Sequence, residues 1–583
     1  MCKNSTKSVA VKLLSVAVIA GLTSFGINAN ATTTEDLKKA EYGTGDTTLN
    51  YGWEVDPSTN GEKLIKDAGS DVVLKYDSTL PALSATTNNQ DLSDTTIIGN
   101  YIDQNVSYLN NRANGKIGTL DLTVINANLT NQRVITNNSN ALIDNIKGNY
   151  AGNTITCNGS CHGGVLYNDG TVNNINANFI GNALISQTHQ SRGGAITNYN
   201  KIGDITGDFI GNYAQGPGVL TSSNYGYGMF GGAIFNYATI GNITGNFIGN
   251  HTDSTVAQST GGAIYNGTNS TIGDIKGNFI GNYAVSSGTW AYGGAIENFG
   301  KIGDITGDFI GNYSKTTGSS NVSGGTILNR NTGSIGNITG NFVNNSAYSV
   351  NKRVSGGVIE NSGILKNITG NFVNNSASSL NSTTVGGVIE NDGIITNIIG
   401  NFTGNTSSGL GVNGGVLYND GSINDIKGDF YNNETNSSSW LNGAVISNNG
   451  GSINSITGTI YNNISNAETY NYGTIFFNKG TINELNLSFL NNKSTTKASY
   501  IGGTLVNHTG GKIDKINGDF INNKISTTGT YAIGGAIYNN SATISEINGY
   551  FEGNSATAQN GFVRGGAIFN YKGQIESFSG DFV

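Results

Sequence analysis

The sequence predicts an all-β fold, a right-handed parallel β-helix solenoid of repeats of about 30 residues, and two observations lead to it. First, a unit with the sequence GGAITNYNKIGDITGDFIGNYA, at 193–214, returns in variant form until the 583-residue chain ends. Second, its apolar residues occur in short, separated runs that alternate with glycine and asparagine turns. They lack the recurrence at three and four residues that marks a helix. One such unit cannot bury its own apolar face, so we expect the copies to stack.

Two short motifs define the repeat, a glycine pair and a phenylalanine that precedes an asparagine by three positions. They recur at Gly231 with Phe247, Gly261 with Phe279, Gly293 with Phe309, Gly324 with Phe342, Gly356 with Phe372 and Gly386 with Phe402. Later units are weaker, and those at Gly443 and Gly473 keep one glycine each. Each unit reads as three strands, roughly GGAITN, KIGDITG and DFIGN. The connection to the next glycine pair varies in length, which predicts loops on one edge of the coil.

Stacking in register places equivalent residues in columns along the coil. Ile, Val and Phe fill the interior, while Asn198 and Asn212 fall into columns with the asparagines of other units. A stacked amide donates to one neighbour and accepts from the other, which satisfies groups that are costly to bury. Parallel crossovers are right-handed by default, so we expect a right-handed coil.

The composition excludes several classes of protein. With 36% hydrophobic residues, 12% charged residues and 86 glycines, it suits a thin coil better than a compact core. The formal net charge is -8 and the 30 Lys and Arg residues form no dense cluster, so nucleic acid is not an expected partner. The apolar residues keep their places in each unit, which argues against disorder.

Residues 1–31 are typical of a secretory signal peptide. Three lysines form a positive end, a short apolar stretch follows, and Ala29-Asn30-Ala31 supplies the small residues of a cleavage site. A membrane anchor is the alternative, and the short, interrupted apolar run disfavours it. We therefore expect an exported protein.

Residues 32–95 lack the repeat and are predicted to form an N-terminal cap, with a helical or mixed segment at 62–68. Such a cap covers the unpaired strand edges at the end of a coil. The β-helix domain is predicted over 96–583. The chain ends inside a GDFIGN motif, so we expect the coil to be truncated at its C-terminal end and more protein to follow in the native product.

The aspartates of the GDITGD step are the obvious candidates for acid and base catalysis. The column of Asp204 changes from unit to unit, and its other members are Asn242, Asp274, Asp304, Asn337, Asn367, Asn397, Asp425, Ser455, Glu484 and Lys515. Catalysis needs a singular constellation, so we interpret this column as a solvated or hydrogen-bonding ladder and assign no catalytic residue. Arginines such as Arg192 and Arg353 are scattered beside turns, and the four histidines show no motif for nucleophilic catalysis.

Metal ions and cofactors are not expected. The glycine pair is followed by Ala-Ile and not by the Gly-x-Asp of calcium-binding nonapeptides, and the carboxylates are too dispersed for a calcium cage. Cys157 and Cys161 bracket a short turn, and in an exported protein a local disulfide is the first interpretation. The alternatives are zinc bound with His162 and a pair of reduced thiols.

Aromatic residues supply the candidate binding surface. Its tyrosines follow the FxxN motif in neighbouring units or lie in the longest connection, residues 213–230: Tyr213, Tyr225, Tyr227, Tyr283 and Tyr313. His251 takes the same position in the unit between. Stacked aromatics bind sugars or partner surfaces. The alternatives are that the rings cover the turn and that the long connection is a tolerated insertion.

The two motifs also carry a family resemblance. GGA with a following Ile stands at 193–196, 261–264 and 565–568, and FxxN at 209–212, 279–282 and 342–345. Repeated behind a signal peptide over roughly residues 96–583, they resemble the polymorphic outer membrane protein type of autotransporter passenger. The resemblance implies a β-helical passenger exported to the surface of a Gram-negative cell, acting in adhesion or host contact. That family also carries a C-terminal translocator barrel, and no run of alternating strands for one follows the repeats, so a C-terminal or separate outer-membrane translocator is an expected partner.

We therefore expect a non-enzymatic adhesin or surface-interaction scaffold at the outer membrane surface or outside the cell. Its expected partner is a ligand on a host cell or a glycan, with no small-molecule cofactor. Two other classes stay open, a carbohydrate-active β-helix enzyme (polysaccharide lyase or glycoside hydrolase) and a purely structural coat protein. Depolymerisation of a glycan separates the enzyme from the adhesin.

Overall fold

The computed structural model describes residues 53–55, 63–66, 73–75, 80–219, 228–497 and 500–583. These residues form strands and turns, and no helix occurs among them. The chain divides into two units, Met1–Lys39 with Gly52–Asp77, and Ala40–Tyr51 with Ser78–Val583. Within the described residues there is no helix of the length and apolarity needed to cross a membrane.

The described part of the first unit is a small antiparallel sheet. It consists of β1 (Trp53–Val55), β2 (Lys63–Lys66) and β3 (Val73–Lys75), paired in that order. The segment expected to be helical or mixed, 62–68, therefore contains strand β2.

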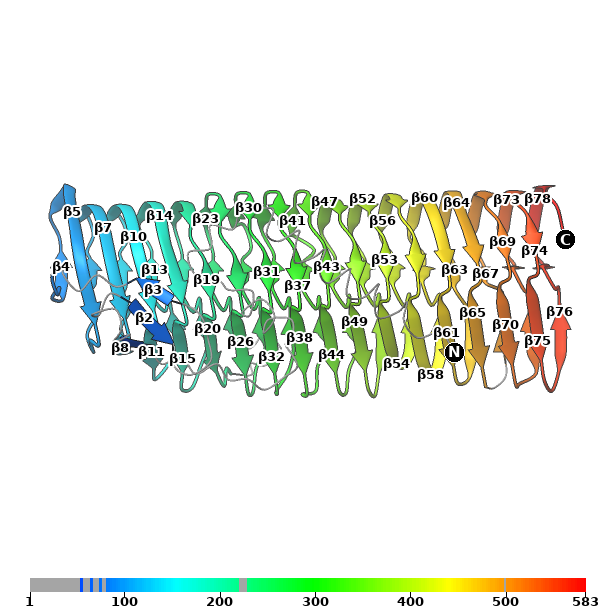
Figure 1. Cartoon of the computed structure of the whole chain (residues 1–583), viewed down its shortest axis with the longest axis horizontal. Coiled ribbons are helices and arrows are strands. Elements are labelled where there is room, and N and C mark those ends of the chain that lie inside the picture. The colour runs from blue at the N-terminus through cyan, green and yellow to red at the C-terminus, as the bar shows by residue number, and fades with distance from the viewer. Residues whose placement is uncertain (1–52, 56–62, 67–72, 76–79, 220–227, 498–499) are drawn as a thin grey trace, which may run out of the picture. The chain divides into compact units, whose positions relative to one another are not determined.

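The described part of the second unit is a right-handed parallel β-helix of about 15 turns spaced by about 30 residues, which confirms the predicted fold class. Equivalent residues of successive turns pair in parallel, as Ile234 does with Ile196 on one side and Ile264 on the other. Figure 1 shows the strands of successive turns side by side along the coil. The first parallel pairing joins β4 (Thr86–Asn88) to β6 (Leu109–Asn111), so the coil includes residues of the segment 32–95 that was assigned to the cap.

Three parallel sheets, called here sheets 1, 2 and 3, surround the interior of the coil. One turn passes through β17 (Ile196–Asn198) in sheet 3, β18 (Lys201–Thr206) and β19 (Phe209–Ile210) in sheet 1, and β20 (Tyr213–Gly216) and β21 (Met229–Phe230) in sheet 2. In Figure 1 the upper row of arrows is sheet 1, which starts at β5 (Asp91–Ile102), and the lower row is sheet 2, which starts at β8 (Asn128–Thr130).

Sheet 2 was not predicted from the sequence. The DFIGN segment continues sheet 1, and sheet 2 is built from the residues directly after the FxxN asparagine and directly before the glycine pair, which were assigned to a loop. The inward residues of this sheet are small and buried, and those of four consecutive turns are Ala214, Thr252, Ala284 and Ser314. Such residues lack the large apolar side chains that mark a buried strand, so the pattern resembled a loop.

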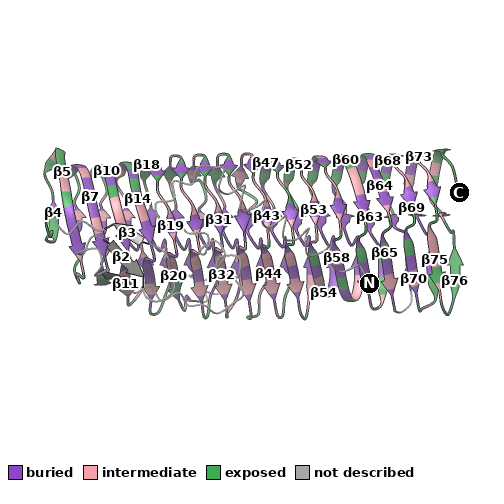
Figure 2. Ribbon diagram, viewed as in Figure 1, coloured by how far each residue is buried: buried purple, intermediate pink, exposed green. Residues whose placement is uncertain are grey.

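Phenylalanines form the central column of the core. The rings of Phe179, Phe209, Phe247 and Phe279 are fully buried and stacked, with centroids 5.1, 5.0 and 4.8 Å apart. The stack continues in the same way through 309, 342, 372 and 402 to Phe430. Figure 2 shows buried residues on the strands of sheet 1 along the coil. Because a fully buried Phe side chain stabilises by roughly 1.5–3 kcal/mol, this column is a main source of stability.

Two asparagine ladders confirm the predicted columns. Asn198 Nδ2 donates to Asn236 Oδ1 at 2.9 Å and to the Thr239 carbonyl oxygen at 3.0 Å. In the second ladder, Asn212 Nδ2 donates to Asn250 Oδ1 at 2.9 Å and to the Phe179 carbonyl oxygen at 2.8 Å. Each amide therefore ties three turns together while it is buried.

The glycine pair makes the corner between sheets 2 and 3. Gly193 has a φ of +71°, and a Cβ atom on it would lie 2.1 Å from the Ile196 carbonyl oxygen. A Cβ atom on Gly194 would lie 2.0 Å from the carbonyl oxygen of Gly232 in the next turn. At Gly193 and Gly194 a side chain would therefore collide with backbone, although two later turns accept Ala444 and Thr474 at the second position. The tight corner brings the residues just before it and just after it to one outer surface.

Candidate functional site

The candidate site is a row of side chains outside the glycine corner, called here the corner strip. Each turn contributes the residue before the glycine pair, the middle residue of the sheet 3 strand and the residue after the asparagine of that strand. In one turn these residues are Arg192, Thr197 and Tyr199. Arg192 Nη1 donates to Tyr199 Oη at 2.9 Å, and Thr197 Oγ1 donates to the Arg192 carbonyl oxygen at 2.5 Å. The three residues thus meet although the corner separates them in the sequence.

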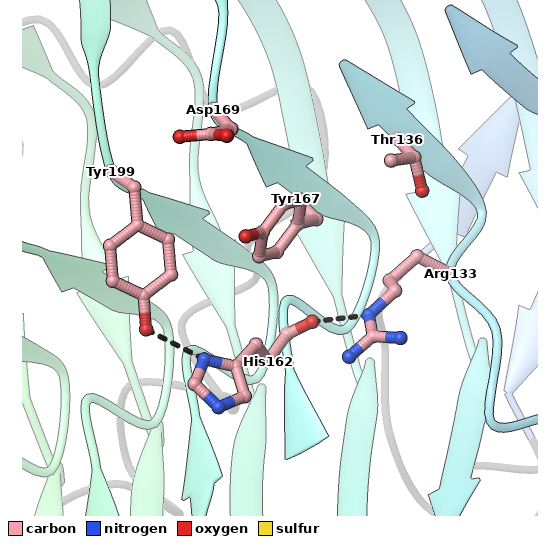
Figure 3. A pocket seen from close by; sticks show the side chains of 6 residues that line it. All are labelled: Arg133, Thr136, His162, Tyr167, Asp169 and Tyr199. Carbon is pink, nitrogen blue, oxygen red and sulfur yellow. Dashed lines mark hydrogen bonds between the residues drawn. The ribbon is translucent and has the colours of Figure 1, made fainter. Parts of the chain in front are cut away.

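The first turns of the strip enclose an open hollow of about 640 Å³. Figure 3 shows the six residues that line it, which come from three successive turns: Arg133, Thr136, His162, Tyr167, Asp169 and Tyr199. The strands that position them are β9 (Ile135–Asn137), β12 (Cys161–His162), β13 (Leu166–Asn168) and β17. All six side chains are half-buried.

His162 is held as a neutral ring in this hollow. Its Nδ1 atom lies 2.6 Å from Tyr199 Oη. Because Arg192 already donates to that hydroxyl, the Tyr199 hydrogen points to Nδ1 and the ring proton is placed on Nε2. Burial and the nearby guanidinium groups of Arg192 and Arg133 lower the pKa of His162 to about 4. At neutral pH the imidazole is therefore a hydrogen-bond donor without charge.

Aromatic and cationic side chains continue the strip beyond the hollow. Arg192 lies over the ring of Phe235 at 5.0 Å, and Phe235 stacks on Tyr265 with centroids 5.1 Å apart. Further on, Arg330 lies 4.3 Å from the centre of the Tyr292 ring. The exposed Tyr237 belongs to the same row. Cations over ring faces in a half-buried strip are well suited to hold polar ligands with flat apolar faces.

The middle turns of the strip contain two buried carboxylates and a half-buried one. Glu297, Glu360 and Glu390 are the middle residues of β34 (Ile296–Asn298), β46 (Ile359–Asn361) and β51 (Ile389–Asn391). Arg330 Nη2 lies 2.7 Å from Glu297 Oε1, and Arg353 pairs with Glu390. Glu297 and Glu390 are each 1% exposed, a degree of burial that is rare for a carboxylate.

Glu360 and Glu390 are register partners on parallel strands of adjacent turns, so they lie side by side on the same face of sheet 3. Burial raises the pKa of Glu360 above its usual value. Burial, and then the neighbouring carboxylate of Glu360, raise the pKa of Glu390 further. The Oε2 atom of each residue is buried without a hydrogen-bond partner among the described residues. Two neighbouring carboxylates resist ionising together, which accounts for the part of the shift at Glu390 that comes from Glu360.

The predicted aromatic surface forms a stacked ladder in sheet 2, apart from the corner strip. Ring centroids lie 4.9 Å apart from Tyr213 to His251, 4.4 Å from His251 to Tyr283 and 4.9 Å from Tyr283 to Tyr313. The rings are half-buried, and neighbouring rings cover each other's faces, which leaves mainly their edges for a ligand. Tyr225 and Tyr227 lie outside the described residues.

The other residues singled out in the sequence lie as follows. Cys157 and Cys161 are joined by a disulfide in the turn that leads to His162. The column of Asp204 is a hydrogen-bonding ladder, in which Asp204 Oδ1 accepts from the Asn242 backbone N–H at 2.7 Å. Within the described residues, no three His, Cys, Asp or Glu side chains are grouped so that they could hold a metal ion.

The corner strip was not predicted from the sequence. Arg192 and His162 looked scattered because the residues that bring them together, Tyr199 and Arg133, lie in other parts of the repeat. A signal was present: the middle position of the I-x-N strand is Glu at 297, 360 and 390, and aromatic at Tyr167 and in several other units, while the residues on either side stay constant.

Comparison of the chain with protein-family models, with curated proteins and with solved structures gave no match.

Proposed function

We propose that the protein is an exported β-helical scaffold that binds an extended ligand along the corner strip and acts as a surface adhesin. One observation carries this proposal. The coil repeats the same corner turn after turn, so aromatic, cationic and acidic side chains of many turns form one half-buried row. A long ligand that contacts several turns gains avidity from many weak contacts.

Several features support this proposal. The signal peptide predicted at 1–31, which lies outside the described residues, and the disulfide of Cys157 with Cys161 suit an exported protein. A β-helix of about 30-residue repeats is compatible with a passenger of the polymorphic outer membrane protein type. We infer that an outer-membrane translocator, C-terminal or separate, delivers it to the cell surface, where a host-cell or glycan ligand is the partner.

Paired tyrosine substitutions test the proposal. Tyr237→Ala with Tyr571→Ala removes two exposed strip side chains, while Tyr470→Ala with Tyr531→Ala removes two of similar exposure in sheet 2. Attachment of the purified protein to host cells and to a glycan panel is measured for both pairs. We expect the strip pair to bind about tenfold more weakly than the wild type and the sheet 2 pair to bind normally. Equal binding by both pairs would reject the strip as the binding surface.

A carbohydrate-active enzyme is a second candidate, because a specific observation favours it. Glycoside hydrolases use two carboxyl groups, one of which stays protonated at neutral pH, and the pKa of Glu390 is raised beside Glu360. New reducing ends or unsaturated products from acidic or neutral polysaccharides, lost in Glu360→Gln and Glu390→Gln, would establish this activity. Intact polysaccharide after prolonged incubation with the wild type would exclude it for the substrates tested.

A further inference from the structure

The hollow at the start of the corner strip has more hydrogen-bond donors than the protein uses. Arg133 is half-buried, and its Nε atom donates to the His162 carbonyl oxygen at 2.6 Å. Across the described ranges, its two Nη groups have no hydrogen-bond acceptor and no carboxylate lies within ion-pair distance of it. Figure 3 shows these Nη groups on the same side as the His162 ring.

The second cation of the region is equally without a carboxylate. Arg192 donates through Nη1 to Tyr199, and its buried Nε atom has no partner in the part of the chain that the structure describes. Burial, and then the guanidinium groups of Arg192 and Arg133, lower the pKa of His162 to about 4, so its ring is uncharged at neutral pH. A chain with a net charge of -8 thus keeps two positive groups together in a sheltered place.

Other groups of the hollow suit hydroxyls and a flat ring. The hydroxyl of Tyr167 has no hydrogen-bond partner among the described residues, and Asp169 offers a carboxylate at the other end of the hollow (Figure 3). The rings of Tyr167 and Tyr199 are tilted by 52° with centroids 5.7 Å apart, so they do not cover each other's faces. Aromatic faces of this kind pack against the apolar faces of sugars.

We propose that this hollow binds the carboxylate or sulfate group of an acidic saccharide. The Nη groups of Arg133 donate to the anionic oxygens in the two-pronged geometry that guanidinium groups favour, and His162 Nε2–H and the Tyr167 hydroxyl add neutral donors. Asp169 accepts hydrogen bonds from sugar hydroxyls, which places the acid group at the Arg133 end. This inference rests on the proposed function and names the ligand class for one part of the strip.

Three probes of similar length separate the sources of the anion: an oligogalacturonate, a sulfated dextran and neutral dextran. Binding to the full chain is measured by calorimetry together with the thermal unfolding midpoint of each variant. We expect at least one acidic probe to bind more tightly than neutral dextran, and Arg133→Gln to weaken that binding about tenfold or more. Arg112→Gln removes the same charge from an exposed side chain outside the hollow, and we expect it to bind like the wild type.

Two further variants keep the test independent of folding. Arg133→Lys keeps the charge but loses the two parallel N–H donors of the guanidinium group, and Tyr167→Phe removes one hydroxyl. We expect each variant to bind the acidic probe several-fold more weakly without lowering the unfolding midpoint. The inference is overturned if Arg133→Gln, folded, binds as the wild type does, or if no acidic probe exceeds neutral dextran. If cell attachment still depends on Tyr237 and Tyr571 in that case, the proposed function stands without the saccharide site. If attachment does not depend on these tyrosines either, both the inference and the proposed function are rejected.

Discussion

Buried polar side chains in this protein differ in how completely they are hydrogen-bonded, and this difference separates structural residues from candidate functional ones. Asparagines inside the two ladders find acceptors and a donor in neighbouring turns. Asn312 Nδ2 donates to Asn345 Oδ1 and to the Phe279 carbonyl oxygen, and Asn312 Oδ1 accepts from Asn282 Nδ2. Glu297, Glu360 and Glu390 of the corner strip each have an Oε2 atom without a hydrogen-bond partner among the described residues. An incompletely paired buried carboxylate costs stability, so its presence calls for another explanation, such as ligand binding or proton transfer.

The pKa of Glu390 predicts how its substitution depends on pH. Its folded-state pKa is raised, mainly by burial and then by Glu360, so its contribution to stability is full below the ordinary pKa of about 4 and is lost as the pH rises through the folded value. We expect Glu390→Gln to match the wild type at pH 4 and to be more stable at pH 7.5. The exposed part of Arg353 then takes up water in place of its partner. Midpoints of urea unfolding at the two pH values check this.

The matched control is Arg353→Gln, which leaves the buried Glu390 carboxylate without its cation. We expect this variant to be close to the wild type at pH 4 and less stable by about 3 kcal/mol at pH 7.5. Asp392 lies near Glu390 and Arg353, and burial raises its pKa too. Its ionisation therefore also lowers the stability of the folded protein as the pH rises. Shifts of equal size at both pH values in either variant would show that ionisation of Glu390 is not the cause.

At the scale of the element, the glycine corner determines where the side chains of the strip meet. Among the described residues, the backbone takes positive φ at three kinds of position in the repeat: at the corner, inside FxxN and at the glycine that follows the second sheet 1 segment, such as Gly245. The first two have similar φ values, +55° at Gly293 and +62° at Gly249. Inside FxxN the residue alternates between Gly and Asn, as in Gly249 and Asn344, because asparagine tolerates this conformation. At the first glycine of the corner pair, by contrast, backbone atoms fill the space that a side chain would need.

The same substitution at the two positions separates these effects. A Cβ atom on Gly249 meets nothing within 4 Å, whereas a Cβ atom on Gly293 would lie 2.2 Å from the Ile296 carbonyl oxygen. We expect Gly249→Asn to change the free energy of unfolding by less than about 1 kcal/mol. We expect Gly293→Asn to lower it by about 3 kcal/mol or more, because backbone must move. Chemical unfolding followed by circular dichroism measures both, and a similar loss for the two variants would contradict the argument.

At the scale of the whole molecule, the sequence predicted the coil because its interior columns repeat large residues at constant positions. Phe209 and Asn212 lie in the columns expected for them. Sheet 2 was missed because Ala214 and its counterparts are small, and the corner strip because its residues are neighbours only after the chain has turned the glycine corner. Periodicity thus predicts what is the same in every turn, and the candidate site lies where the turns differ.

A solenoid stabilised by contacts between adjacent turns predicts that a whole turn can be removed and half a turn cannot. Ile264 pairs in register with Ile296, so deletion from Ile264 to Ala295 rejoins each sheet and preserves the corner sequence. We expect this variant to keep its β-sheet circular dichroism, resist proteolysis and unfold within a few degrees of the wild type. Deletion from Ile264 to Phe279 joins Ala263 to the end of a sheet 1 strand and shifts every column against its neighbours. We expect that variant to aggregate or to be degraded rapidly, because inward and outward residues no longer match across the junction. Equal tolerance of the two deletions would mean that stability does not come from the register of the stacked columns.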